Sequence, residues 1–208
     1  QLRTFSGILQ VDGYAAYETL AGRRRKTNGG QIRLAHCLAH ARRKFVEVYQ
    51  RTGSSAAMDV LTMIAEVYRV EAMVRGEGAD RRLEARATHS TPIMAALKEK
   101  LLATRVGISS QSSLAGAIAY TLARWSGLTA FLADGRIEVD SNVIERSMKS
   151  VALTRKNALF AGNAEGGRTW AILASLIETA KLNGLDPQAW LTDVLEKIVT
   201  GRVTNDRL

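Results

Sequence analysis

Apolar residues recur every three or four positions through most of the middle and end of this chain, and this spacing constrains the fold more than any other feature. Series of this kind begin at Met58, Ile93 and Leu114, and two more follow Trp170 and Pro187. Only two prolines interrupt the 208 residues, and long stretches lack the alternation of a strand. The sequence therefore predicts a mostly helical α+β protein.

The three middle series predict three helices that bury one face each, as a small bundle does. Thr91-Pro92 suits the first turn of the second helix. The predicted core positions are Met58, Leu61, Ile64, Ala65, Tyr68 and Ala72 in the first helix, Ile93, Leu97 and Leu101 in the second, and Leu114, Ile118, Leu122, Trp125, Leu128 and Leu132 in the third.

Two short strands are predicted before these helices. Gly7–Gly13 is a short apolar run that ends in a turn and places Asp12 at the C-terminal end of the first strand. Ile32–Cys37 is the second candidate strand. The connecting segments are a short helix over Tyr14–Leu20, a basic loop over Arg23–Gly30, and a helix from about Leu38 to Tyr49.

A further helix is predicted to start near Asp140 or Ser141, either of which suits an N-cap. Glu145 then falls in its first turn or two, where the helix dipole favours a carboxylate. A loop through Arg155–Asn157 and Gly162 is expected to lead into the final two helices. The first of these should end at Asn183-Gly184 and the second should begin at Pro187.

Positive charge is concentrated in the first quarter of the chain. The net charge is +9, and residues 1–52 carry ten Lys and Arg against three Asp and Glu. Such a field attracts polyanions, of which nucleic acid is the commonest in the cytoplasm, although a solubilising surface is the alternative.

The single Cys37 cannot form an internal disulfide, which suits a reducing compartment. No apolar run approaches the roughly 20 residues of a membrane span, so we expect a cytoplasmic protein without a membrane partner.

Several longer motifs resemble the transposases of the insertion sequence 66 family. They follow one another in the family's order and spacing from about Gly7 to Ile198. Matches of eight or more residues are far more specific than a single short pattern. The motifs are Val11–Tyr14, His36–Phe45, Gly135–Arg146, Arg155–Gly162 and Ser175–Gly184.

This resemblance implies a ribonuclease H-like fold with an Asp, Asp, Glu triad that holds two Mg²⁺ or Mn²⁺ ions and cuts and joins DNA. By the match, Asp12 is the second aspartate and Glu145 is the glutamate, so both are expected to be catalytic and metal-binding. The expected organisation is a partial ribonuclease H-like fold that lacks its early strands and carries an all-helical insertion. Its parts are residues 1–52 in the catalytic core, 53–135 as the insertion, 136–165 in the core with the glutamate helix, and 166–208 as a C-terminal helical pair.

The family's first aspartate lies on an early strand, upstream of the segment that resembles Gly7–Gly13. No residue before Asp12 is acidic here. We therefore expect this chain by itself to be an inactive fragment that binds metal weakly. The early strands would pair with one edge of the sheet, and without them this edge is expected to favour aggregation or dimerisation. A homo-oligomer is therefore one expected state of the chain.

Basic side chains near the two carboxylates are the candidates for contacts with DNA phosphates, which position the DNA without reading its sequence. The candidates are His40, Arg42, Arg43, Arg146, Lys149, Arg155 and Lys156.

His36, Cys37 and His40 raise a separate zinc hypothesis. A structural zinc normally takes four ligands, and the remaining histidine, His89, falls in the predicted insertion. The family carries a similar Cys-x-x-His, which favours a different role: Cys37 and His40 would brace the strand-to-helix junction.

Two other functions remain open at this stage. A transposase remnant that has lost its triad but kept its basic surfaces would be a non-enzymatic DNA-binding or assembly module. A nuclease of the same fold would use the same metal chemistry. An upstream strand that bears an aspartate would restore the triad and favour a transposase over the DNA-binding module. Strand-transfer products would distinguish a transposase from a nuclease.

Overall fold

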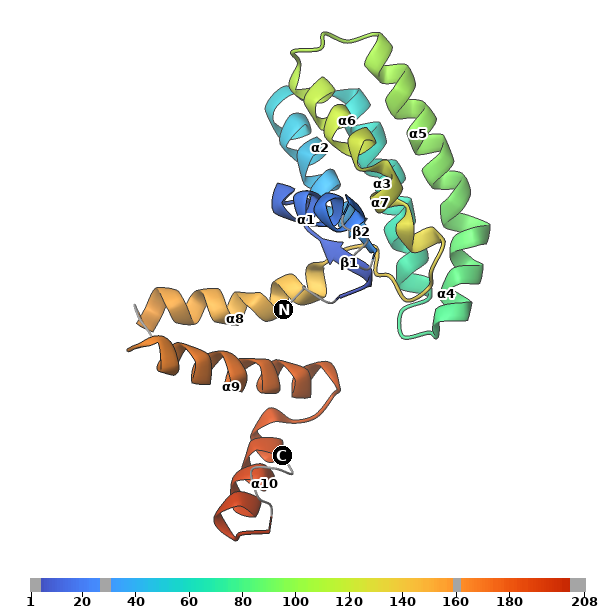
Figure 1. Cartoon of the computed structure of the whole chain (residues 1–208). Helices are drawn as coiled ribbons and strands as arrows, with labels where there is room; N and C mark the ends of the chain where they lie inside the picture. Colours follow the sequence, from blue (N-terminus) through green and yellow to red (C-terminus); the bar gives the residue numbers. More distant parts are fainter. Residues whose placement is uncertain (1–4, 27–30, 159–161, 203–208) are drawn as a thin grey trace. The chain divides into compact units, whose positions relative to one another are not determined.

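The computed structural model describes residues 5–26, 31–158 and 162–202. The chain divides into two compact units, Gln1–Asn142 and Val143–Leu208. The first contains a small sheet and a helical bundle, and the second contains the last three labelled helices (Figure 1). The expectation of a mostly helical chain with a small amount of sheet is confirmed.

Two parallel strands form the sheet of the N-terminal unit. β1 (Gly7–Val11) pairs with β2 (Ile32–His36) in a register that runs from Gly7 opposite Ile32 to Val11 opposite His36. Parallel strands need a crossover connection, which α1 (Ala15–Lys26) supplies while packing on β2. Both predicted strands are therefore confirmed, and their carboxyl ends lie at the same edge.

The helix after β1 is longer than predicted. Arg23–Lys26, which we expected in a loop, belong to α1. Arginine and lysine are good helix formers, and no proline or glycine occurs between residues 23 and 26 to stop the helix. The remainder of the predicted loop, residues 27–30, lies outside the described residues.

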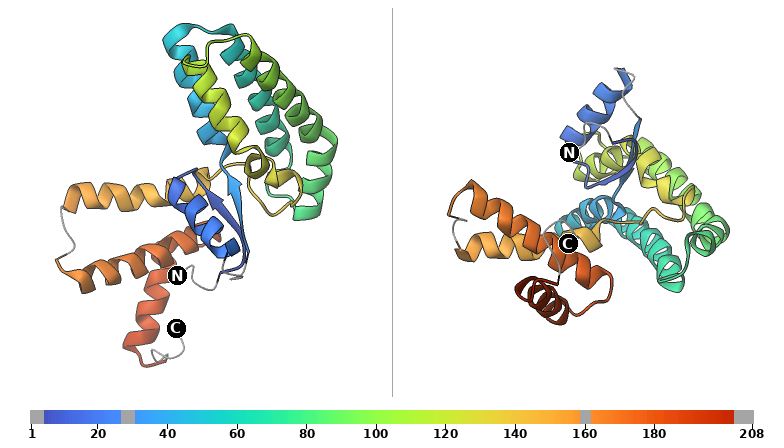
Figure 2. Two further views of the ribbon diagram at one scale, coloured as in Figure 1. Left: turned by 45° about the horizontal axis from the view of Figure 1, so that its top comes forward. Right: turned by 60° about the horizontal axis from the view of Figure 1, so that its bottom comes forward.

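Four helices form the bundle of the N-terminal unit. Each has two neighbours among the others, so they lie side by side (Figures 1 and 2). One buried core runs from Ala35 in β2 through all of them. The helices are α2 (Leu38–Thr52), α3 (Ser55–Met73), α5 (Thr91–Val106) and α6 (Ser113–Ala123).

Shorter helical elements complete the bundle. α4 (Ala79–Ala85) continues into a π-helical turn, η1 (Arg86–Ser90), before α5. α7 (Trp125–Leu128) and a 3₁₀ turn, η2 (Ala130–Leu132), follow α6 and pack against β2. The Arg86 side chain is fully enclosed, where its guanidinium donates to both carboxylate oxygens of Glu71 at 2.7 Å.

Two details of the predicted bundle are wrong. Of the residues predicted in the core face of α3, Ile64 is buried and Leu61 and Tyr68 pack partly buried against the core, but Met58, Ala65 and Ala72 are exposed. The core face is displaced, because the other buried residues of α3 are Ala57, Val60, Val67 and Val70. The helix has apolar residues around most of its circumference, so spacing alone does not select the face. The third predicted helix is not continuous either, because it breaks at Arg124 between α6 and α7.

The C-terminal unit consists of α8 (Asn142–Ala158), α9 (Ala164–Leu182) and α10 (Pro187–Val199), with α9 packed on α10. The predicted ends at Asn183 and Pro187 are confirmed. The predicted loop at Arg155–Asn157 is wrong, because α8 runs through it to Ala158. No glycine or proline occurs between residues 142 and 158 to end this helix earlier. Among the described residues, no helix is both long and apolar enough to cross a membrane.

The segment just before α8, Ile137–Ser141, is called the linker segment below. Ile137 and Val139 are buried in the core of the bundle. Its backbone is held at the sheet, because the Leu38 N–H donates to the Val139 carbonyl at 3.0 Å. The residues that lead into the glutamate helix are therefore fixed at the junction of β2 and α2.

Candidate functional site

Asp12 follows the last residue of β1, at the carboxyl edge of the sheet, and its side chain is exposed. Its Oδ1 accepts the backbone N–H of Tyr14 at 3.0 Å, which orients the carboxylate. Gly13 completes the turn with a φ of 94°, where a side chain would be strained. An added Cβ there would also lie 2.6 Å from the Tyr120 hydroxyl. The turn that presents Asp12 therefore requires glycine.

Two side chains at the end of α6 hold this turn. The Tyr120 hydroxyl and the Arg124 guanidinium donate to the carbonyls of Asp12 and Gly13, each at 3.5 Å. Arg124 also lies over the Tyr120 ring, 4.2 Å from its centroid, and pairs with Glu18 at 3.3 Å. Burial raises the pKa of Tyr120, so its hydroxyl keeps the proton that it donates. Sequence reasoning assigned neither residue a role at the site, because nothing in the spacing of α6 points to β1.

His36 is the last residue of β2, and its side chain is almost fully enclosed. Its Nε2 lies 3.7 Å from the Glu18 carboxylate, and Gly127 of α7 approaches so closely that an added Cβ would lie 2.1 Å from its Nδ1. Burial, and then the charge of Arg124, lower the pKa of His36 despite the opposing charge of Glu18. A neutral, enclosed imidazole is suited to packing rather than to binding a phosphate.

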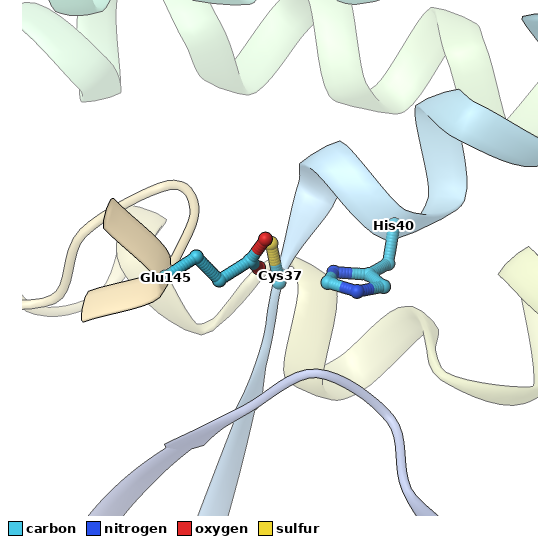
Figure 3. A group of neighbouring side chains, drawn as sticks. All are labelled: Cys37, His40 and Glu145. Carbon is cyan, nitrogen blue, oxygen red and sulfur yellow. The ribbon is translucent and has the colours of Figure 1, made fainter. Parts of the chain in front are cut away.

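Cys37 and His40 lie at the junction of β2 and α2, as Figure 3 shows. The Cys37 thiol is buried, and its Sγ accepts the backbone N–H of Ser141 at 3.2 Å. The sulfur lies within 4.8 Å of a ring nitrogen of His40, which is half-buried. Cys37 thus braces the junction against the linker segment, as we expected of it.

The described residues do not assemble the four ligands of a structural zinc. Neither His36 nor His89 joins Cys37 and His40 in a cluster of ligand atoms among them. His89 is exposed in η1, in the bundle.

Asp140 and Tyr68 form a second polar group at this junction. The Asp140 carboxylate accepts the backbone N–H of Asn142 at 3.0 Å and its side-chain amide at 2.6 Å, at the start of α8. Burial, and then the neighbouring charge of Asp140, raise the pKa of Tyr68, which reaches the group from α3. Tyr68 was predicted only as a core residue, because its spacing in α3 carries no sign of a polar partner.

Glu145 lies in the first turn of α8, as predicted, and its side chain is exposed. It belongs to the C-terminal unit, whereas Asp12 belongs to the N-terminal unit. The approach of the two carboxylates therefore stays a prediction.

The predicted phosphate contacts are distributed over two helices. Arg42 and Arg43 are exposed on α2. Arg146, Lys149 and Lys156 are exposed on α8. The position of Arg155 is also in α8, but its side chain lies outside the described residues.

Comparisons with known proteins cover the whole chain. Residues 1–169 match the family model of the transposase IS66 family, and residues 175–208 match that of the IS66 C-terminal element. No solved structure matches the chain, so nothing there tests the ribonuclease H-like fold.

Curated relatives from Sinorhizobium fredii (strain NBRC 101917 / NGR234) are similar along almost all of the chain. The uncharacterized protein y4jD is 60% identical over 208 residues, which are 100% of this chain and 41% of that protein. The uncharacterized protein y4qI is 47% identical over 201 residues, 96% of this chain and 37% of that protein. This chain thus spans about two fifths of the length of these relatives. With its sheet, its linker segment and both carboxylate-bearing motifs inside the matched ranges, the chain belongs to the transposase IS66 family.

Proposed function

We propose that this chain is part of a DNA transposase that cuts and joins DNA phosphodiesters with divalent metal ions. Asp12 and Glu145 would each supply one carboxylate to the metal site. The observation that carries the proposal is the place of Asp12: an exposed carboxylate at the carboxyl edge of a parallel sheet, in a chain of a transposase family. Ligands in open α/β sheets bind at this edge.

The residues fit a site for Mg²⁺ or Mn²⁺. Hard ions prefer carboxylate oxygens, and the local hydrogen bond of Asp12 orients one oxygen while the side chain stays exposed. Asp12, together with Glu145, would hold such ions, which when bound would supply charge stabilisation for the attacking and leaving oxygens of the displacement. A third carboxylate is needed, and we place it in residues that precede this chain in the longer protein.

The linker segment supports the role of Glu145. Ser141 is bonded to Cys37 at the carboxyl edge of the sheet. Glu145 follows only four residues later, and an extended chain of that length spans at most about 14 Å. Chain connectivity alone thus keeps the glutamate in the neighbourhood of this edge.

The exposed cations would hold the DNA. Arg42 and Arg43 on α2, and Arg146, Lys149 and Lys156 on α8, are exposed, as contacts with phosphates would require. His40 and Arg155 stay candidates for the same kind of contact. Contacts of this kind position the DNA and weaken as salt rises.

The test is a calorimetric titration with Mg²⁺ and Mn²⁺. It compares this chain with a longer protein that includes the upstream strand expected to bear the first aspartate. We expect the extended protein to bind metal, this chain to bind weakly, and Glu145→Gln or Asp12→Asn to abolish binding in the extended protein. Glu165→Gln, at an exposed glutamate in the first turn of α9, is the matched control.

Metal-dependent cleavage and joining of DNA by the extended protein should follow the same pattern. Robust Mg²⁺-dependent cleavage by this chain alone would contradict the need for a third carboxylate. Absence of metal binding by both proteins in the presence of DNA would leave a non-enzymatic DNA-binding module as the function.

A further inference from the structure

The linker segment is held by three different parts of the N-terminal unit. The side-chain amide of Gln10 donates from Nε2 to the Glu138 carbonyl at 3.0 Å and to the Asp140 carbonyl at 2.8 Å. Cys37 and Leu38, at the start of α2, bind the segment through the Ser141 and Val139 backbone. The successive carbonyls of residues 138, 139 and 140 are thus all engaged by side-chain or backbone donors.

The bundle holds the same segment through an ion pair. Arg82 of α4 donates to the two carboxylate oxygens of Glu138, each at 2.8 Å, and lies 3.6 Å from Glu71. Glu138 therefore uses its side chain toward the bundle and its carbonyl toward Gln10. Substitution of Gln10 leaves the Arg82 ion pair in place, which separates the effect of the amide from general loosening of the segment.

Gln10 has a distinctive position in the chain. It lies two residues before Asp12 in β1, and its backbone pairs with Ala35 of β2. The carbonyls that it binds lie four and two residues before Asn142, where α8 begins. One side-chain amide therefore connects the strand that ends at Asp12 with the backbone that leads into the helix of Glu145.

We propose that Gln10 is a positioning residue: its side-chain amide sets the spacing between the Asp12 strand and the start of the Glu145 helix. This inference rests on the proposed function. Gln10 does not bind metal or DNA in this scheme. It acts by fixing two backbones whose carboxylates must converge on the same ions, and small misplacements of reacting groups are costly in such sites.

The decisive variant is Gln10→Met, which keeps the length of the side chain but removes its donor. Gln10→Lys keeps a donor and is the rescue variant. Gln31→Met is the matched control, since Gln31 is an exposed glutamine just before β2, at the other end of the sheet. Asp12→Asn is included to test the proposed function in the same assay.

The first measurement is hydrogen exchange of this chain, which requires no catalysis. In Gln10→Met we expect faster exchange of the Leu38 N–H, which donates to the linker segment, and of the first turn of α8. Gln10→Lys should recover most of the protection, and Gln31→Met should match the parent chain. Unchanged exchange in Gln10→Met would show that the Gln10 amide does not hold the linker segment in place.

The second measurement is DNA cleavage by the protein extended to the length of the relatives. Gln10→Met should lower kcat by roughly 10- to 100-fold, as a misplaced group does. KM for DNA should be unchanged, and the Mg²⁺ concentration that gives the half-maximal rate should rise. Gln10→Lys should restore kcat and the Mg²⁺ dependence. A merely structural role would lower the thermal midpoint without changing the metal dependence.

The outcomes are distinguishable. If Asp12→Asn abolishes cleavage while Gln10→Met cleaves like the parent protein, the positioning role is overturned and the proposed function stands. Equal losses in Gln10→Met and Gln10→Lys also overturn it, because the donor then plays no part. If Asp12→Asn cleaves normally, both proposals fail, since there is no carboxylate to position.

Discussion

Arg86 is a single side chain on which several buried groups depend. Its guanidinium donates to Glu71 and to the carbonyls of Phe131 and Asp134, at 3.0 and 3.3 Å, and lies over the Phe131 ring. It thereby ties α3 to the turn before the linker segment. No pattern in the sequence singles out this residue, because a lone arginine in a helical segment is normally exposed.

Replacement of this arginine should be strongly destabilising. We expect Arg86→Ala to lower the free energy of unfolding by about 3–5 kcal/mol, because it empties a buried site and leaves the nearly enclosed Glu71 with only the more distant Arg82, at 3.6 Å. Arg81→Ala is the control, since Arg81 makes an exposed pair with Glu84 and should change stability by less than about 0.5 kcal/mol. Urea denaturation measures both, and similar values for the two variants would refute the role given to Arg86.

At the scale of elements, helical spacing predicted the helices well and their contacts poorly. β1, β2, α2 and α9 were found close to their predicted bounds, because alternation, caps and Gly-Pro signals are local. The break between α6 and α7 was not predictable from spacing, since the apolar series continues through it. Beyond the break, Gly127 of α7 lies against His36 of β2, where an added Cβ would overlap the imidazole ring.

Alanine substitutions at Gly127 and Gly116 should change the free energy of unfolding in opposite directions. Gly127→Ala should lower the free energy of unfolding by about 1–3 kcal/mol, because the new methyl group overlaps the His36 ring. Gly116→Ala should raise it by up to about 1 kcal/mol, since Gly116 lies exposed within α6 with open space around its Cα. Thermal denaturation of the two variants tests this, and a stabilising Gly127→Ala would show that the close approach is not required.

The two units of the molecule differ in how many apolar side chains they bury. The N-terminal unit has an extensive core, whereas Ala180 is the one buried side chain among those described beyond residue 142. Many apolar side chains of the C-terminal unit are exposed, among them Ile144, Ile172, Leu173, Leu176 and Leu195. Local stability follows buried apolar contact, so the units should differ in stability.

Hydrogen exchange should show this difference directly. We expect the backbone amides of α9 and α10 to exchange well before those of α2, α3 and α6, because little apolar burial opposes their opening. The measurement is exchange mass spectrometry of this chain at neutral pH. Equal protection of both groups would mean that another surface, such as a second copy of the chain, covers the exposed apolar residues.

The candidate site was predictable only in part. Asp12 and Glu145 came from motifs, and the structure places them at a strand end and in a first helical turn, as expected. Arg124, which contacts the turn at Asp12, and Gln10, which contacts the linker segment, lie far from their partners in sequence. Such contacts depend on tertiary packing, which no local pattern encodes.

The bond between Cys37 and Ser141 joins residues 104 positions apart and makes the intervening chain a closed loop. The entropy of closing a loop grows slowly with length, by about 0.6 kcal/mol for each doubling. The entropy of this closure therefore depends little on how many residues lie between the two ends, which stay at the sheet as long as the shared core of the four helices is intact. Insertions in surface loops of the bundle, outside that core, should therefore leave the junction of β2 and α2 unchanged.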